Sequence, residues 1–287
     1  MTKGKQQTTN DKKQQRAIML TPKELERYSR QIQLPDLGEK GQKALKNTTA
    51  LVSGVGGLGG TTALYLAVAG IGKLILVRGG GLRLDDMNRQ ILMSDDWVGK
   101  TRVTKAQETL NQINPDVEVE AIAEYITPEN VDALVQRSDI ALSCAHNFPE
   151  RDLLNAACVR WQKPMVEAAM NSMEAYLTTI VPHQTPCLSC LFPEKPNWDR
   201  RAFGVLGAVS GTLACLSALE AIKLITGLGK PLLGQLLNMD LANVEFHKLH
   251  LYKDPDCPVC GKEAEGAEGT LNHGKGERPF APTTTNH

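Results

Sequence analysis

The stretch that decides the fold reads Ala50-Leu51-Val52-Ser53-Gly54-Val55-Gly56-Gly57-Leu58-Gly59. Its apolar start predicts a short strand, its glycines predict a tight turn, and the residues from Leu58 predict a helix. Glycines let a backbone approach a phosphate closely, and a helix N-terminus adds free N–H donors and a partial positive charge. Because the loop opens a βαβ unit, it predicts a nucleotide site, with a purely structural glycine turn as the alternative. The nucleotide-binding glycines would be Gly54, Gly56, Gly57 and Gly59.

Outward from this loop, apolar strands alternate with helical segments. Further strands are expected at 74–77, 117–122, 139–143 and 165–169, and helices at 58–69, 100–114, from Thr127 onward and at 149–161. This alternation predicts an α/β fold with a Rossmann-like, doubly wound, mostly parallel sheet. The β-rich segments 175–181 and 232–251 lack regular crossover helices, so we expect them to extend the sheet with antiparallel strands. Before the loop, a capping box at Thr21-Pro22-Lys23-Glu24 predicts a helix to about Ile32, and a short helix should cover 40–45.

Composition describes an ordinary globular protein. The 32 basic and 32 acidic residues cancel, which gives no electrostatic reason to expect nucleic acid or an anionic membrane as partner. The polar, aperiodic ends 1–18 and 262–287 are predicted to be disordered, leaving one domain at 19–261. No apolar segment near the start reads as a secretory signal, so a cytoplasmic location is expected. The uncharged segment 202–219 approaches the length of a membrane span, but its small and polar residues favour a buried helix.

Four of the seven cysteines fall into two CxxC pairs. Two such pairs can place four thiolates around one zinc ion, whereas a redox function needs only one pair, and four unrelated thiols are the remaining alternative. A zinc ion held by four thiolates has no open position, so the site should be structural. The other three cysteines, in apolar segments, are expected to be packing residues. The predicted zinc ligands are Cys187, Cys190, Cys257 and Cys260.

The residue after the second strand bears on which nucleotide is bound. A dinucleotide site usually has an acidic residue there to bind the ribose, but this chain has Arg78. Arginine suits a 2′-phosphate, so an NADP-dependent oxidoreductase is one alternative function. No feature after residue 150 suggests a hydride-transfer site, which weakens that alternative.

Several motifs occur together in one order. They are the RYSRQI segment at 27–32, the GVGGLG loop at 54–59, Asn88-Arg89-Gln90, Val98-Gly99-Lys100, the helical segment 218–223 and the two CxxC pairs. Over about residues 21–261 the chain resembles the ubiquitin-activating (E1-like) family of HesA, MoeB and ThiF, and most closely its HesA branch. The resemblance implies an E1-like fold and a homodimer that binds ATP and Mg²⁺. It implies adenylation of the C-terminal carboxylate of a small ubiquitin-like or sulfur-carrier protein, and for the HesA branch a link to nitrogen fixation and metal-cluster assembly.

By the same resemblance, Arg89 would contact phosphate and Arg30 would reach the nucleotide of the other subunit. The alternative is that both are ordinary surface or helix-capping charges. The family's ribose-binding acid is replaced by Arg78, and its phosphate-binding lysine falls on Arg102, although Lys100 is a possible substitute. The predicted nucleotide-binding side chains are Arg78, Asn88, Arg89, Lys100 and Arg102, and the predicted catalytic residues are Arg30, Arg89 and His146.

The largest departure from the family is His146, where most adenylating members have a magnesium-binding aspartate. A neutral histidine is a poor ligand for Mg²⁺, which prefers oxygen donors. His146 would either bind phosphate when protonated or satisfy a loop carbonyl. A second departure is Asp86, which falls on the family's asparagine. These departures leave a non-catalytic scaffold that keeps the fold as the main alternative to an enzyme.

Overall fold

The computed structural model describes residues 19–195 and 204–261, so the predicted disordered ends lie outside the described residues. The stretch quoted above forms strand β1 (Thr49–Ser53), buried from Ala50 onward, followed by the glycine turn and helix α4 (Gly57–Ala69). Successive side chains of a strand point to opposite faces of its sheet. Ala50 and Val52 accordingly pack in one apolar cluster and Leu51 in another.

Eight strands form one sheet in the order β3-β2-β1-β4-β5-β6-β7-β8. The strands from β3 to β5 are mutually parallel, and the later ones pair antiparallel. This arrangement confirms the predicted fold class, including the antiparallel extension. The other strands are β2 (Lys73–Val77), β3 (Glu118–Ile122), β4 (Ile140–Ser143), β5 (Met165–Asn171), β6 (Glu174–Ile180), β7 (Gln235–Asp240) and β8 (Glu245–His250).

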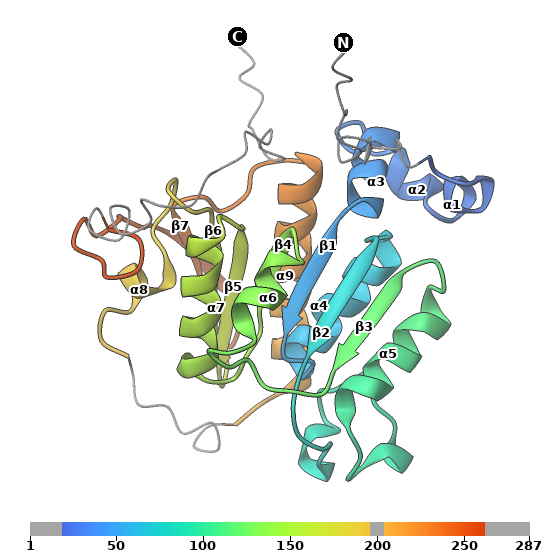
Figure 1. The fold of residues 1–287 in the computed structure, drawn as a ribbon, viewed down its shortest axis with the longest axis horizontal. Helices are drawn as coiled ribbons and strands as arrows, with labels where there is room; N and C mark the ends of the chain where they lie inside the picture. The colour runs from blue at the N-terminus through green and yellow to red at the C-terminus, as the bar shows by residue number, and fades with distance from the viewer. Residues whose placement is uncertain (1–18, 196–203, 262–287) are drawn as a thin grey trace, which may run out of the picture.

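Helices cover both faces of the sheet, as a doubly wound fold requires (Figure 1). Helix α4 packs on one face with α5 (Arg102–Ile113) and α9 (Gly207–Thr226). The opposite face carries α6 (Val131–Gln136), α7 (Phe148–Arg160) and the short α8 (Leu188–Leu191). Two 3₁₀ turns, η1 (Leu84–Asp86) and η2 (Asp95–Trp97), lie between β2 and α5.

Two predicted helix boundaries are wrong. Thr127 does not cap α6, because its backbone N–H donates to Asn130 Oδ1 at 2.9 Å in a turn, and the helix begins only after Asn130. The helix expected from Thr21 to Ile32 is divided at Tyr28 into α1 (Pro22–Arg27) and α2 (Ser29–Ile32), before α3 (Gly38–Lys46). The capping box at Thr21 and Glu24 is confirmed.

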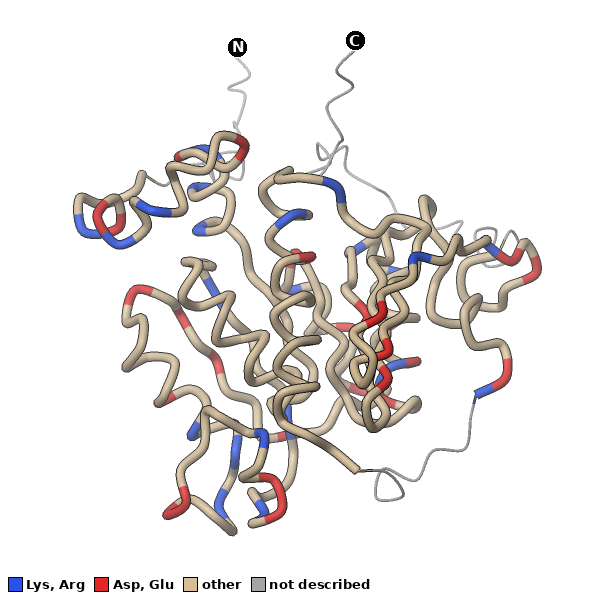
Figure 2. The backbone as a smooth tube through the Cα atoms, turned by 180° about the vertical axis from the view of Figure 1, so that it is seen from behind, with Lys and Arg blue, Asp and Glu red and all other residues tan. Residues whose placement is uncertain are grey.

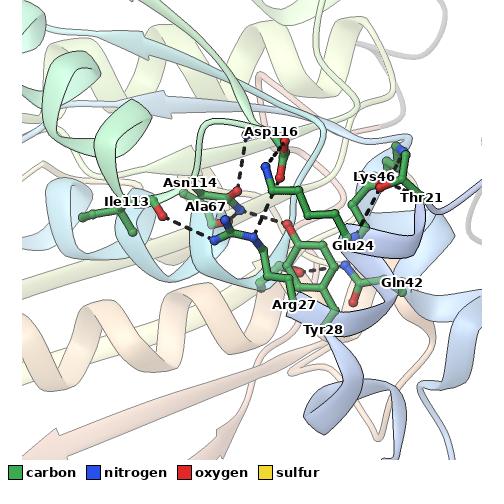
Figure 3. Close-up of polar contacts among 12 residues, drawn as sticks. Thr21, Glu24, Arg27, Tyr28, Gln42, Lys46, Ala67, Ile113, Asn114 and Asp116 are labelled. Carbon is green, nitrogen blue, oxygen red and sulfur yellow. Dashed lines mark hydrogen bonds and ion pairs between the residues drawn. The ribbon is translucent and has the colours of Figure 1, made fainter.

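Contacts with the body of the fold explain the break at Tyr28. Its side chain is buried, and its hydroxyl accepts a hydrogen bond from Asn114 Nδ2 at 2.9 Å (Figure 3). The neighbouring Arg27 donates to the carbonyl of Ile113 at 3.4 Å and lies 3.8 Å from Asp116. These contacts fix α1 and α2 to the end of α5, beside the amino ends of the parallel strands (Figure 1).

Helix α9 is the apolar segment that the sequence predicts to be a buried helix, although it begins at Gly207 and residues 202–203 are outside the described part. Within residues 19–195 and 204–261 it is the one helix long and apolar enough to cross a membrane. Half of its most apolar window is buried, because one side packs against α4 and β5. The other side remains open, with Cys215 exposed and Leu219 45% exposed.

Candidate functional site

A pocket of about 800 Å³ lies at the carboxyl ends of β1, β2 and β4. Strand β1 lies between β2 and β4, so the strand order reverses direction at β1. Such a reversal is a topological switch point, where ligands of open α/β sheets bind. We call it the switch-point pocket. Most of the predicted nucleotide-binding and catalytic residues line it: Gly54, Gly56, Gly57, Arg78, Asn88, Arg89, Arg102 and His146.

The glycines of the loop serve different purposes. A Cβ on Gly59 would lie 1.8 Å from the carbonyl oxygen of Gly54, so Gly59 is needed for close packing and does not line the pocket. Gly54 has a φ of +90°, which disfavours any side chain. Gly56 caps α4 and lines the pocket, and a Cβ there would meet nothing nearer than Gln90 Nε2 at 3.9 Å. The fold itself therefore does not require a glycine at position 56.

Asp86 holds two arginines at the pocket. Its side chain is only 9% exposed, and its Oδ1 lies 2.9 Å from Arg89 Nη2 while its Oδ2 lies 3.3 Å from Arg102 Nη2. The backbone N–H of Arg83 also donates to Oδ2, at 3.1 Å. Charge-assisted bonds of this kind fix guanidinium groups in place. The structure thus presents two positioned cations in the pocket that also contains the glycine loop. Figure 2 shows basic residues (blue) and acidic residues (red) close together in the loops at the lower end of the molecule.

On the adjacent wall of the pocket, Arg78 contacts His146. Arg78 Nη1 lies 2.9 Å from His146 Nδ1. A guanidinium can only donate, so Arg78 is the donor of this contact, and Asn147 Nδ2 lies 3.4 Å from the other ring nitrogen, Nε2. This contact tests neither role expected for His146, phosphate binding as a cation or satisfaction of a loop carbonyl, so both stay predictions. The guanidinium of Arg78 also lies 5.4 Å from the ring centre of Tyr125 and 4.0 Å from Glu150 Oε1.

Tyr125 and Arg151 line the pocket but are not among the predicted site residues. Arg151, on α7, is buried and forms an ion pair with the buried Glu167 of β5. Its Nε donates to the carbonyl of Ala145 at 2.7 Å, which supports the loop that carries His146. An arginine in the first turns of a helix looks like a surface charge in the sequence. Nothing in the spacing of residues distinguishes Arg151 from an ordinary surface arginine.

Two predicted site residues lie away from the pocket. Lys100 is exposed and stacks over the ring of Trp97 at 4.8 Å, so it is not among the lining residues. Arg30 is exposed on α2, at the end of the sheet opposite the pocket (Figure 1). Neither reaches the switch-point pocket of its own chain.

The two CxxC pairs meet at α8, whose N-cap is Cys187. All four sulfur atoms lie within 4.8 Å of one another, with Cys187 Sγ 3.7 Å from Cys257 Sγ and Cys190 Sγ 3.4 Å from Cys260 Sγ. A tetrahedral zinc ion with Zn–S bonds of about 2.3 Å separates its sulfurs by about 3.8 Å, so this four-cysteine cluster fits a metal ion. Disulfide bonds would need about 2.05 Å.

The cysteines outside the cluster differ in exposure. Burial raises the pKa of the Cys144 thiol, which lines the pocket, to about 12. Burial has the same effect on the pKa of Cys158, also to about 12. Both thiols are therefore protonated at neutral pH and are poor nucleophiles. Cys215 is exposed on α9.

Comparison with known proteins agrees with this geometry. The model of the ThiF family matches residues 28–259. The protein named HesA, heterocyst, of Trichormus variabilis is 72% identical over 247 residues, which cover 86% of this chain and 92% of that protein. The adenylyltransferase and sulfurtransferase MOCS3 of Drosophila sechellia is 39% identical over 85% of this chain and 55% of its own length. Among solved structures, E. coli MccB with ATP has a TM-score of 0.73 at 28% identity, covering 82% of this chain and 73% of that chain.

Proposed function

This chain belongs to the ThiF family, and from that premise we propose that it adenylates the C-terminal carboxylate of a small ubiquitin-like or sulfur-carrier protein at the expense of ATP. The observation that carries the proposal is the arginine-lined pocket around the glycine loop, at the switch point of the sheet. One relative is named as an adenylyltransferase, and one similar structure contains ATP.

In this proposal the chain mainly positions its substrates and balances charge. The backbone N–H groups at the start of α4 face the phosphates, and Arg89 and Arg102, held by Asp86, neutralise them. A carboxylate oxygen of the carrier protein attacks the α-phosphorus, and the bond from that phosphorus to the bridging oxygen breaks. The products are an acyl adenylate and pyrophosphate, whose negative charge the same guanidiniums stabilise.

We propose further that the active form is a homodimer. Arg30 lies at the end of the sheet opposite its own pocket, so it can serve a nucleotide only in another subunit. The open side of α9, including Leu219 at 45% exposure, offers apolar surface for such an association.

The remaining finer proposals concern metal and pathway. We propose that zinc occupies the four-cysteine cluster, where four thiolates would leave no open position and the metal would only hold segments together. The resemblance to the HesA branch supports a cytoplasmic role in metal-cluster or cofactor assembly for nitrogen fixation.

The first test is calorimetric titration of the purified protein with ATP and, separately, with NADPH. We expect ATP to bind, and pyrophosphate exchange to follow when a small ubiquitin-like carrier protein of the same organism is added. Arg89→Ala should lower the exchange rate about 100-fold, the usual cost of removing a group that stabilises transition-state charge. Arg137→Ala, which removes an exposed arginine paired with Glu120, is the matched control and should leave exchange unchanged.

Other outcomes would identify a different function. Binding of NADPH in preference to ATP would favour the oxidoreductase, with Arg78 at the 2′-phosphate. No binding of either nucleotide would contradict adenylation and favour a scaffold that retains only the fold.

A further inference from the structure

The resemblance to the E1-like family implies a magnesium ion at the nucleotide, and the pocket can be tested for groups that would hold it. Mg²⁺ in nucleotide sites is usually held by one or two carboxylates together with the substrate phosphates. Within residues 19–195 and 204–261, the carboxylates that line the switch-point pocket are Asp85 and Asp86. This inference rests on the proposed function, because it concerns how the same pocket takes ATP.

Both carboxylates already bind arginine. Asp86 has Arg89 on one oxygen and Arg102 on the other. Asp85 is chelated by Arg83, with Oδ1 2.8 Å from Nε and Oδ2 3.1 Å from Nη2. A divalent cation placed on either aspartate would lie within a few ångströms of a guanidinium. At that separation the two like charges repel, and solvent screens the repulsion least at the buried Asp86.

Position 146, where the family has its magnesium-binding aspartate, supplies no other carboxylate in this chain. His146 directs the lone pair of Nδ1 at Arg78, 2.9 Å away, and a ring nitrogen is a poor donor to Mg²⁺. The nearest acid in the following helix, Glu150, is buried, accepts from Asn147 Nδ2 at 2.6 Å, and is not among the lining residues. The residues that the structure describes therefore do not fit a carboxylate-held magnesium ion.

Arginine is abundant in the same pocket. Among the described residues, five arginines line it against the two aspartates: Arg78, Arg83, Arg89, Arg102 and Arg151. One of the five, Arg151, is paired with the buried Glu167. Guanidinium groups neutralise phosphate oxygens and bind them bidentately. We infer that this pocket neutralises the phosphates of the nucleotide with arginine and ligates no magnesium through a carboxylate, so that ATP binds independently of Mg²⁺.

The test is the affinity for ATP, measured by calorimetry in excess MgCl₂ and again in excess EDTA. For the wild-type protein we expect the two dissociation constants to agree within about threefold. A carboxylate-held ion would make binding in EDTA at least about tenfold weaker, since the loss of one such contact exceeds about 1.4 kcal/mol. A wild-type protein that loses tenfold or more in EDTA would overturn the inference.

Two variants at one position sharpen the comparison. His146→Asp adds a carboxylate beside the phosphates, so it should weaken ATP binding in EDTA and recover it with Mg²⁺, giving at least a tenfold dependence on the metal. His146→Asn keeps an acceptor for Arg78 without charge, and its ratio of affinities should match the wild type. A tenfold magnesium dependence in His146→Asn as well would contradict the inference, because it would place the metal site elsewhere in the pocket.

The same measurements separate this inference from the proposed function. Magnesium-independent ATP binding without pyrophosphate exchange would support the inference and count against the enzyme. Magnesium-dependent binding with exchange would support the enzyme and reject the inference. An absence of ATP binding in both conditions would contradict both.

Discussion

Gly56 and Gly59 stand three residues apart in the same loop, yet a methyl group would meet very different surroundings at each. At Gly59 it would collide with the carbonyl of Gly54 at 1.8 Å, whereas at Gly56 the nearest atom is 3.9 Å away. Gly56 also has a φ of −79°, which alanine adopts without strain. Gly59 is therefore constrained by the fold, whereas Gly56 is constrained by what enters the pocket.

This difference predicts opposite behaviour for Gly56→Ala and Gly59→Ala. Gly56→Ala should keep the melting temperature of the wild type while weakening ATP binding by at least about tenfold, because its Cβ keeps the phosphates from the backbone. Gly59→Ala should fail to reach the native fold or melt far lower. Thermal melts and calorimetry measure the two effects. Normal ATP affinity in Gly56→Ala would show that the phosphates do not approach this part of the loop.

For individual residues, the sequence identifies those whose position follows from a motif. It misses residues that reach the site through contacts between distant parts of the chain. The glycine loop could be placed because it follows directly from a local pattern, whereas Arg89 was placed by the family resemblance. The resemblance also indicates Arg102, which lines the pocket beside Asp86; its contact with phosphate stays a prediction. Tyr125 was missed because it reaches the pocket from the loop after β3, and its partner Arg78 is 47 residues earlier in the chain. No spacing rule connects such residues.

Among the secondary-structure elements, strands and long helices followed from the sequence while two helix ends did not. Local propensity favours continuing α1 through Tyr28, but the contact of its hydroxyl with Asn114, 86 residues away, decides the geometry. For α6, the side chain of Asn130 captures the backbone of Thr127, so a turn replaces the expected first helical turn. In both cases a side-chain hydrogen bond overrides the preference of the backbone.

The four-cysteine cluster joins two parts of the chain that are far apart in the sequence. It links the start of α8 to the segment after β8, and it packs beneath α7 in the second apolar cluster. Removing one ligand would leave three thiolates and a weakened metal site.

We therefore expect Cys187→Ser and Cys257→Ser each to lose bound zinc and to lower the melting temperature by roughly 10 °C. Binding of ATP at 20 °C should change much less, because no cluster residue lines the pocket. Cys215→Ser, which alters an exposed cysteine outside the cluster, is the control and should keep the zinc content of the wild type. Full zinc content in both cluster variants, measured by atomic absorption, would rule the site out.

For the whole molecule, the separation between Arg30 and the pocket bears on whether one chain can form a complete site. The two lie at opposite ends of the parallel strands, so one chain cannot complete its own site if Arg30 takes part (Figure 1). A homodimer related by a two-fold axis would contribute one Arg30 to each of two pockets.

This geometry predicts complementation between two inactive variants. Arg30→Ala and Arg89→Ala should each lower pyrophosphate exchange about 100-fold, and a mixture refolded or co-expressed in equal amounts should recover about a quarter of wild-type activity. Half of the randomly formed dimers are mixed, and each mixed dimer contains one intact pocket served by one intact Arg30. Mixing the proteins without subunit exchange is the control. If co-expression restores no exchange, Arg30 does not act across the interface.

The four-cysteine cluster also has a consequence for the order in which the protein is made. Its two pairs are 70 residues apart, so Cys187 and Cys190 leave the ribosome well before Cys257 and Cys260. All of α9, β7 and β8 is synthesised in that interval. A nascent chain can offer the metal only two thiolates until the last pair emerges, and two thiolates bind zinc far less tightly than four. In the proposed zinc-bound form, the supply of zinc in the cell would therefore act late in biosynthesis, when the antiparallel end of the sheet is completed.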